Sequence, residues 1–221
     1  MVVAGVVFDM DGVIIDSEQV WDDVREQLVR DWGGRYSSEA QRAMMGMSSP
    51  EWSRYMHNDL GLAQEPEEIN AEVVRRMLER YRHDLPLLDG AVEAVRSLAA
   101  SYPLAVASSS NRPLIDAVLE TAGIAECFVA TVSSEEVPRG KPSPDVYLEA
   151  ARRLGVAPAD CAAVEDSGNG IRAAKAAGMY VVAYPNEHYA PDAEALGLAD
   201  VLIERLDELE AAVSLQARTT G

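Results

Sequence analysis

The sequence is poor in cysteine and contains no long apolar run. Its two cysteines, Cys127 and Cys161, lie far apart and lack the spacing of a metal site. Two isolated cysteines suit a reducing compartment, and no signal peptide is recognisable, so we expect a cytoplasmic protein. The longest apolar runs have the length of strands, so we expect no membrane span.

Basic residues are also scarce. The chain has 19 lysines and arginines against 37 aspartates and glutamates, a formal net charge of −18. Binding to a nucleic-acid backbone needs a basic face, so this balance argues against a nucleic-acid partner. It remains compatible with a small phosphorylated ligand held in a local pocket. The excess of acid keeps the protein soluble.

The remaining composition is that of a globular protein. The 221 residues are 48% hydrophobic and 25% charged, and they contain no internal repeat or low-complexity tract. This length suffices for one large domain, or for one domain with a smaller insertion.

Short apolar runs alternate with helical patterns over much of the chain. The predicted strands cover residues 2–8, 104–107, 128–132, 161–164, 179–184 and 200–203. The predicted helices between them cover 91–100, 113–121, 142–154 and 171–177. Strands that alternate with helices indicate an α/β fold with a doubly wound, Rossmann-like parallel sheet.

The segment after the first strand contains only helical patterns. Helices are predicted at about 20–32, 38–45, 50–59 and 66–82, with glycine or proline at several of their ends. We therefore expect a core domain of residues 1–15 and 89–221 with an all-helical cap domain of residues 16–88 inserted in it. Such an insertion commonly covers the crevice at the carboxyl ends of the strands.

Polar residues follow three of the predicted strands and one loop. They are Asp9 and Asp11, Ser108 and Ser109, Glu165 and Asp166, and Lys141 on the loop. In a parallel sheet these strand ends share one edge. Each group alone is common in turns and helix caps. Their joint occurrence at strand-to-helix junctions is the informative signal.

Together these residue types suit phosphoryl chemistry. Carboxylates from two strands are oxygen ligands for Mg²⁺, and serine hydroxyls with nearby backbone N–H groups suit phosphate oxygens. A lysine adds positive charge for the same anion. One aspartate can then attack phosphorus while a second moves the proton.

Four motifs carry a resemblance to a known family. They are the segments at 9–17 (DMDGVIIDS), 108–111 (SSSN), 140–145 (GKPSPD) and 165–171 (EDSGNGI). Together they resemble the haloacid dehalogenase superfamily, and more narrowly its phosphoglycolate phosphatase and β-phosphoglucomutase branch. The resemblance extends over residues 6–184, nearly the whole chain.

The resemblance assigns the two aspartates of the first motif to catalysis. Asp9 would be the nucleophile that forms an aspartyl-phosphate, and it would also belong to the metal site. Asp11 would protonate the leaving alkoxide and later activate water, while its backbone carbonyl would bind Mg²⁺.

The resemblance also implies roles for the other motifs. Ser108 would bind the phosphate through its hydroxyl and Ser109 through its backbone N–H. Lys141 would pair with the phosphate and with Asp9. Asp166 would bind Mg²⁺ directly, and Glu165 would do so weakly or through water.

Two further activities within this superfamily can be compared with the sequence. The dehalogenase branch attacks carbon and needs neither Mg²⁺ nor the second aspartate, so Asp11 favours phosphoryl transfer. In β-phosphoglucomutase, a cap histidine and an arginine after a Gly-x-Ser turn orient the sugar phosphate. The matching positions here are Trp21 and Ser49, and neither can hold a second phosphate by charge. Three cap arginines, Arg54, Arg75 and Arg76, could compensate, but the sequence does not place them.

We therefore predict Mg²⁺-dependent hydrolysis of a small phosphate monoester, such as a sugar phosphate. The alternatives are a β-phosphoglucomutase-like mutase and a catalytically silent phosphometabolite-binding protein. The intact catalytic set argues against the silent protein. The cap candidates for substrate specificity are Trp21, Gly46, Met47, Ser48 and Ser49. The sequence leaves the substrate and the oligomeric state open; a monomer suits a cap that has to move.

Overall fold

The computed structural model describes residues 2–44, 47–186 and 190–218, and its centre is a parallel sheet. The described strands lie in the order β3-β2-β1-β4-β5-β6, and every neighbouring pair is parallel. They are β1 (Gly5–Phe8), β2 (Leu104–Ser108), β3 (Phe128–Ser133), β4 (Cys161–Glu165), β5 (Tyr180–Ala183) and β6 (Val201–Leu202). The predicted doubly wound α/β sheet is confirmed.

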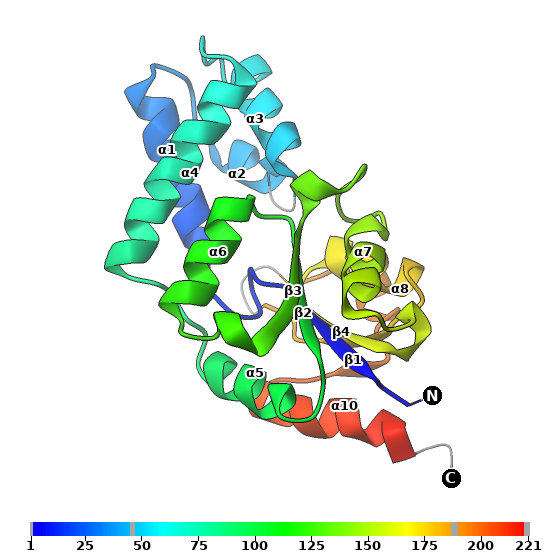
Figure 1. Cartoon of the computed structure of the whole chain (residues 1–221). Coiled ribbons are helices and arrows are strands. Elements are labelled where there is room, and N and C mark those ends of the chain that lie inside the picture. The colour runs from blue at the N-terminus through cyan, green and yellow to red at the C-terminus, as the bar shows by residue number, and fades with distance from the viewer. Residues whose placement is uncertain (1, 45–46, 187–189, 219–221) are drawn as a thin grey trace.

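Helices cover both faces of this sheet because its central strands are apolar on both sides. Along β1, Val6 and Phe8 belong to one buried cluster and Val7 to the other. The first cluster includes side chains of α5 (Ala91–Ala99), α6 (Arg112–Thr121) and α10 (Leu209–Arg218). The second includes side chains of α7 (Asp145–Leu154) and α8 (Gly168–Ala176), on the opposite face (Figure 1).

Several boundaries differ from the sequence predictions. The first strand begins at Gly5 rather than at residue 2. Helix α7 begins at Asp145 instead of residue 142, because Ser143 precedes a proline and is disfavoured in the helical region. Helix α8 begins at Gly168 rather than at residue 171. Its N-cap is Ser167, whose hydroxyl accepts a hydrogen bond from the Gly170 N–H. Helix α10 and the short α9 (Ala193–Leu196) have no counterpart in the prediction.

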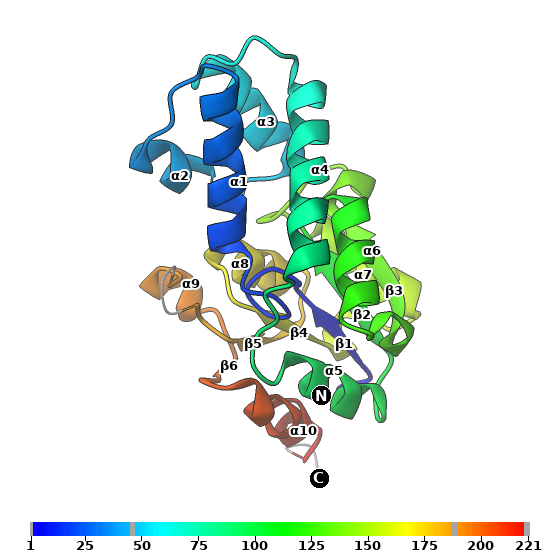
Figure 2. The same cartoon turned by 90° about the vertical axis from the view of Figure 1, so that its left-hand side faces the viewer.

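Between β1 and α5 the described chain is helical. Its elements are α1 (Glu18–Asp31), α2 (Ser38–Met44), α3 (Ser49–Asn58) and α4 (Pro66–His83). They stand together beyond one end of the sheet, the end at which β1 terminates (Figures 1 and 2). We propose that residues 16–88 form the cap and that the remaining residues form the core domain.

The two connections between these regions lie side by side. Ile15 and Leu87 form an antiparallel bridge. The backbone N–H of Asp16 donates to the Pro86 carbonyl, and that of Leu88 donates to the Ile14 carbonyl. The chain therefore leaves the sheet and returns to it at neighbouring points.

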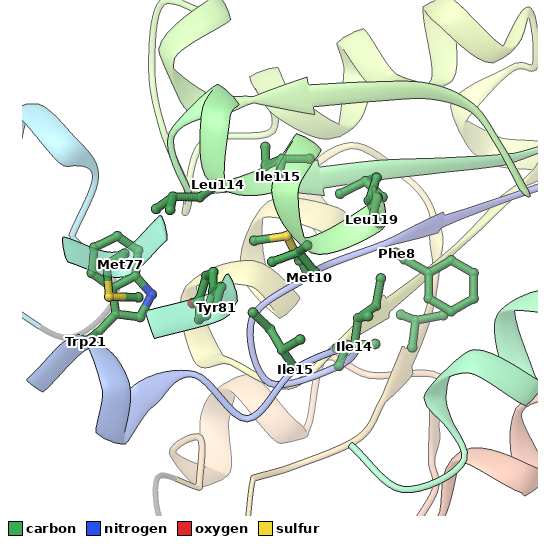
Figure 3. Close-up of a cluster of buried hydrophobic side chains, with 14 of the residues drawn as sticks. Phe8, Met10, Ile14, Ile15, Trp21, Met77, Tyr81, Leu114, Ile115 and Leu119 are labelled. Carbon is green, nitrogen blue, oxygen red and sulfur yellow. The ribbon is translucent and has the colours of Figure 1, made fainter. Parts of the chain in front are cut away.

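The helical region also shares buried apolar contacts with the sheet region. Met77 and Tyr81 on α4 belong to the same buried cluster as Met10, which follows β1, and Leu114 on α6 (Figure 3). Burial of this kind stabilises the packing of the helical region against the sheet region through the hydrophobic effect. In the part of the chain that the structure describes, no helix is both long and apolar enough to cross a membrane.

Candidate active site

The sheet order explains why the polar strand ends meet. Strand β1 lies between β2 and β4, so Asp9 follows a strand flanked by those that end at Ser108 and Glu165. All three strands run in the same direction, and the ends lie at one edge. The topology alone therefore brings three of the four predicted motifs together.

Lys141 joins two of these ends through ion pairs. Its Nζ lies 2.9 Å from Asp9 Oδ1 and 2.6 Å from Glu165 Oε1, and all three side chains are buried. The two carboxylates raise the pKa of Lys141 although burial by itself would lower it. The contact with Asp9 lacks hydrogen-bond geometry, so Asp9 Oδ1 accepts no hydrogen bond from the described residues. The raised pKa keeps Lys141 positively charged beside Asp9.

Glu165 is held on both of its oxygens. Oε1 accepts hydrogen bonds from Lys141 and, at 2.7 Å, from the Tyr147 hydroxyl. Oε2 accepts from the backbone N–H groups of Asp166 and Ser167 and from the Ser167 hydroxyl, each at 3.1 Å. These hydrogen bonds fix the Glu165 carboxylate in place. The neighbouring carboxylate of Asp166 lines the pocket and accepts no hydrogen bond from the described residues.

The acids form a cluster that fits a divalent cation. Carboxylate oxygens of Asp9, Glu165 and Asp166 lie within 4.8 Å of one another. Burial raises the pKa of Asp9 to about 8, against the opposing charge of Lys141. Burial, then the charges of Glu165 and Asp9, raise the pKa of Asp166 well above its usual value. A bound cation would stabilise the ionised carboxylates, and an all-oxygen donor set suits Mg²⁺.

Asp11 is fixed by four side chains from both regions. Its Oδ1 accepts from the Ser17 hydroxyl at 2.5 Å and from Trp21 Nε1 at 3.3 Å. Its Oδ2 accepts from the Ser110 hydroxyl at 2.7 Å and from the Ser108 hydroxyl at a long 3.4 Å. These donors hold the Asp11 carboxylate at the wall of the pocket that Asp9 also lines.

The serine motif divides into buried and pocket-lining members. Ser108 is fully buried, and its oxygen accepts from the Ser110 N–H at 3.0 Å. Ser109 and Ser110 line the pocket. Sequence reasoning missed Ser110 and Ser17 as Asp11 partners, although both lie within the motifs that carried the resemblance.

Two glycines make this close packing possible. A Cβ at Gly12, where φ is +79°, would lie 2.0 Å from Asp166 Oδ2. A Cβ at Gly170 would lie 1.7 Å from Glu165 Oε1. Both separations are far below van der Waals contact, so each glycine allows backbone to approach one carboxylate of the cluster.

The helical region supplies the other wall of the pocket. Its lining side chains there are Glu18, Trp21, Arg25, Met44, Met47 and Trp52. Of the predicted specificity residues, Trp21 and Met47 lie in this wall, and Gly46 lies outside the described residues. Their roles in specificity stay predictions.

Ser48 and Ser49 have other contacts. Ser48 caps α3: its N–H and hydroxyl donate to Glu51 at 2.8 and 2.6 Å. The buried Ser49 hydroxyl donates to Asn111 Oδ1, at the start of α6, at 2.9 Å. Neither serine is among the described residues that line the pocket with Asp9.

The cationic residue of the cap wall is Arg25, which sequence reasoning missed. The three arginines considered from the sequence have other partners: Arg54 donates to the Pro50 carbonyl, while Arg75 and Arg76 pair with Glu72. Arg25 follows Trp21 by four residues, one helical turn, and this spacing on a pocket-facing helix is the signal that could have found it.

Comparison with known proteins identifies the family. Residues 3–178 match the haloacid dehalogenase-like hydrolase family. The chain belongs to this family. Hexitol phosphatase B of Escherichia coli (strain K12) is 36% identical over 217 residues, which are 93% of each chain.

Two further comparisons agree with this assignment. The crystal structure of CbbY from Rhodobacter sphaeroides with phosphate superposes with a TM-score of 0.85 and 25% identity, and covers 96% of this chain and 99% of that one. The bifunctional riboflavin kinase/FMN phosphatase of Arabidopsis thaliana is 34% identical over 183 residues. That match covers 82% of this chain but only 48% of the plant protein.

Proposed function

We propose that this hydrolase is a phosphatase that cleaves a small phosphate monoester, with Asp9 as nucleophile. The observation that carries the proposal is the position of Asp9, buried beside Lys141 and Asp166 and facing a pocket that Asp11 also lines. The relationship to hexitol phosphatase B supports a sugar or polyol phosphate as substrate.

The side chains have complementary parts in the proposed reaction. An Asp9 oxygen attacks phosphorus, the bond from phosphorus to the ester oxygen breaks, and Asp11 gives its proton to the leaving alkoxide. Asp11 then takes a proton from water, which attacks the aspartyl-phosphate and releases phosphate and the free Asp9 carboxylate. Lys141 and the Ser109 backbone hold the phosphoryl oxygens.

A divalent cation fits beside these groups. Asp9 and Asp166 would hold it through their carboxylates and Asp11 through its backbone carbonyl, with Glu165 acting as a weaker or indirect partner. When bound, Mg²⁺ would neutralise charge on the transferring phosphoryl group.

The pocket favours hydrolysis over a mutase reaction. Trp21 matches the position of the histidine of β-phosphoglucomutase, and its indole N–H donates a hydrogen bond to Asp11. The test is an assay of phosphate release from a panel of phosphorylated metabolites, with β-glucose 1-phosphate included. Release of phosphate supports the proposal. Conversion of β-glucose 1-phosphate to glucose 6-phosphate without phosphate release would show a mutase instead.

A further inference from the structure

Arg25 is a buried cation of the pocket that makes no hydrogen bond or ion pair with the described residues. The residue is 8% exposed, and its Nε is buried without a hydrogen-bond partner. Its Cζ lies 4.6 Å from the ring centroid of Trp21 and 5.1 Å from that of Trp52. Stacking on aromatic rings holds the guanidinium by its face and leaves the in-plane N–H groups for another acceptor.

No acceptor for these N–H groups is supplied within the described residues. The side chain of Arg25 makes no hydrogen bond or ion pair there. The buried Nε–H is costly without a partner, and Arg25 lies on the wall of the pocket that contains Asp9. The pocket therefore presents Arg25 to whatever fills it.

Glu18 provides the complementary acceptor. It lies seven residues before Arg25 on α1, so the two side chains share a helix face, and both line the pocket. Burial raises the pKa of Glu18, and the nearby charge of Arg25 opposes this shift. The two side chains are nevertheless not within ion-pair distance, and the Glu18 carboxylate has no hydrogen bond from the described residues.

Because Arg25 offers donors and Glu18 an acceptor to the same pocket, together they favour a ligand group that both accepts and donates hydrogen bonds. A hydroxyl can accept from Arg25 and donate to Glu18. A second phosphate or a carboxylate would satisfy Arg25 but would be repelled by Glu18. A nucleobase would need an open aromatic face, whereas Trp21 is 7% exposed and Trp52 is 1% exposed.

We propose that Arg25 and Glu18 bind a hydroxyl of the substrate's alcohol part. The enzyme then selects monophosphates of sugars or polyols, whose alcohol part is uncharged and carries several hydroxyls, over bisphosphates and nucleotides. This inference rests on the proposed phosphatase function and adds the residues that choose the substrate.

The test compares kcat/KM for sorbitol 6-phosphate with kcat/KM for phenyl phosphate, which has no hydroxyl to recognise. Arg25→Met is expected to lower the ratio of the two values at least tenfold, and Glu18→Gln to lower it severalfold. Arg25→Lys keeps the charge without the planar fork and should recover only part of the ratio. Arg30→Met is the control on the same helix, because Arg30 is exposed and pairs with Glu26; its ratio should match that of the wild type.

Three results would overturn the inference. Equal losses on both substrates in Arg25→Met would show a purely structural role. A wild-type preference for fructose 1,6-bisphosphate that Arg25→Met removes would make Arg25 a site for a second anion. A preference for uridine 5′-monophosphate would point to a base.

Binding distinguishes failure of this inference from failure of the phosphatase proposal. In the Asp9→Asn background, calorimetry should show at least tenfold weaker binding of sorbitol 6-phosphate after Arg25→Met, with no such change after Arg30→Met. Absence of turnover on every substrate counts against the phosphatase proposal alone, whereas unchanged binding in Arg25→Met counts against the role of Arg25.

Discussion

The core wall and the cap wall of the pocket satisfy their charges in different ways. On the core wall, Lys141 pairs with two carboxylates and Glu165 has partners on both oxygens. On the cap wall, Arg25 donates no hydrogen bond to the described residues and Glu18 accepts none from them, and Arg25 is held by stacking. The core groups are therefore fixed before a substrate arrives, whereas the cap groups obtain partners from it.

The largest expected effect is on the core wall. Asp9→Asn removes the nucleophile and should lower turnover by ~10³-fold or more while the fold is retained. Phosphate release and a thermal melt measure the two properties. Substantial residual turnover in a folded Asp9→Asn protein would contradict the proposed mechanism.

Metal addition tests whether the acid cluster is completed by a cation. With Mg²⁺ at a hundred times its Kd, binding to the folded state contributes about 2.7 kcal/mol, or roughly 5–10 °C in Tm for a chain of this size. Excess chelator should abolish activity and this gain. Asp166→Asn should no longer show the Mg²⁺-dependent shift. The same melt without Mg²⁺, with only monovalent salt present, provides the baseline.

The close backbone approach to Glu165 gives a stability test. Gly170→Ala would place a methyl group against the Glu165 carboxylate, at a cost of about 1–3 kcal/mol from overpacking. Gly168→Ala, on the same helix, first meets the flexible end of Arg172 at 3.0 Å and should cost little. Urea unfolding of both variants measures the difference; equal stabilities would mean that Glu165 can move away freely.

The smallest expected effect lies at a contact between the helical region and the sheet region, away from the residues that line the pocket with Asp9. Ser49→Ala leaves the buried Asn111 Oδ1 without this donor and should cost about 1 kcal/mol of unfolding free energy. Ser97→Ala, which removes an exposed hydrogen bond to Glu210, is the control and should change stability less. A changed substrate preference in Ser49→Ala without loss of stability would support its predicted specificity role.

The sequence predicts the core part of the site better than the cap part, because the sheet topology by itself determines which core residues meet. Residues that follow parallel strands must meet at one edge, so Asp9, Ser108 and Glu165 could be grouped without coordinates. The contacts of Asp11 with Ser17 and Trp21 depend on how α1 lies over the sheet, and nothing in local periodicity reports that angle. Arg25 shares a helix face with Trp21, and that spacing could have revealed it, but its contact with Trp52 on another helix is not visible in any local pattern. Domain boundaries and residue roles remain predictions.

The bridge between Ile15 and Leu87 makes the helical insertion separable from the sheet in principle. Its two ends are adjacent, so a different insertion could occupy the same place without stretching β1 or β2, as tolerated domain insertions do. A transplanted insertion would, however, have to bring its own donors for Asp11, because Ser17 and Trp21 belong to the exchanged segment. Substrate range can thus be redesigned by grafting, provided that the graft keeps a serine and an indole N–H, or equivalents, at its first helix.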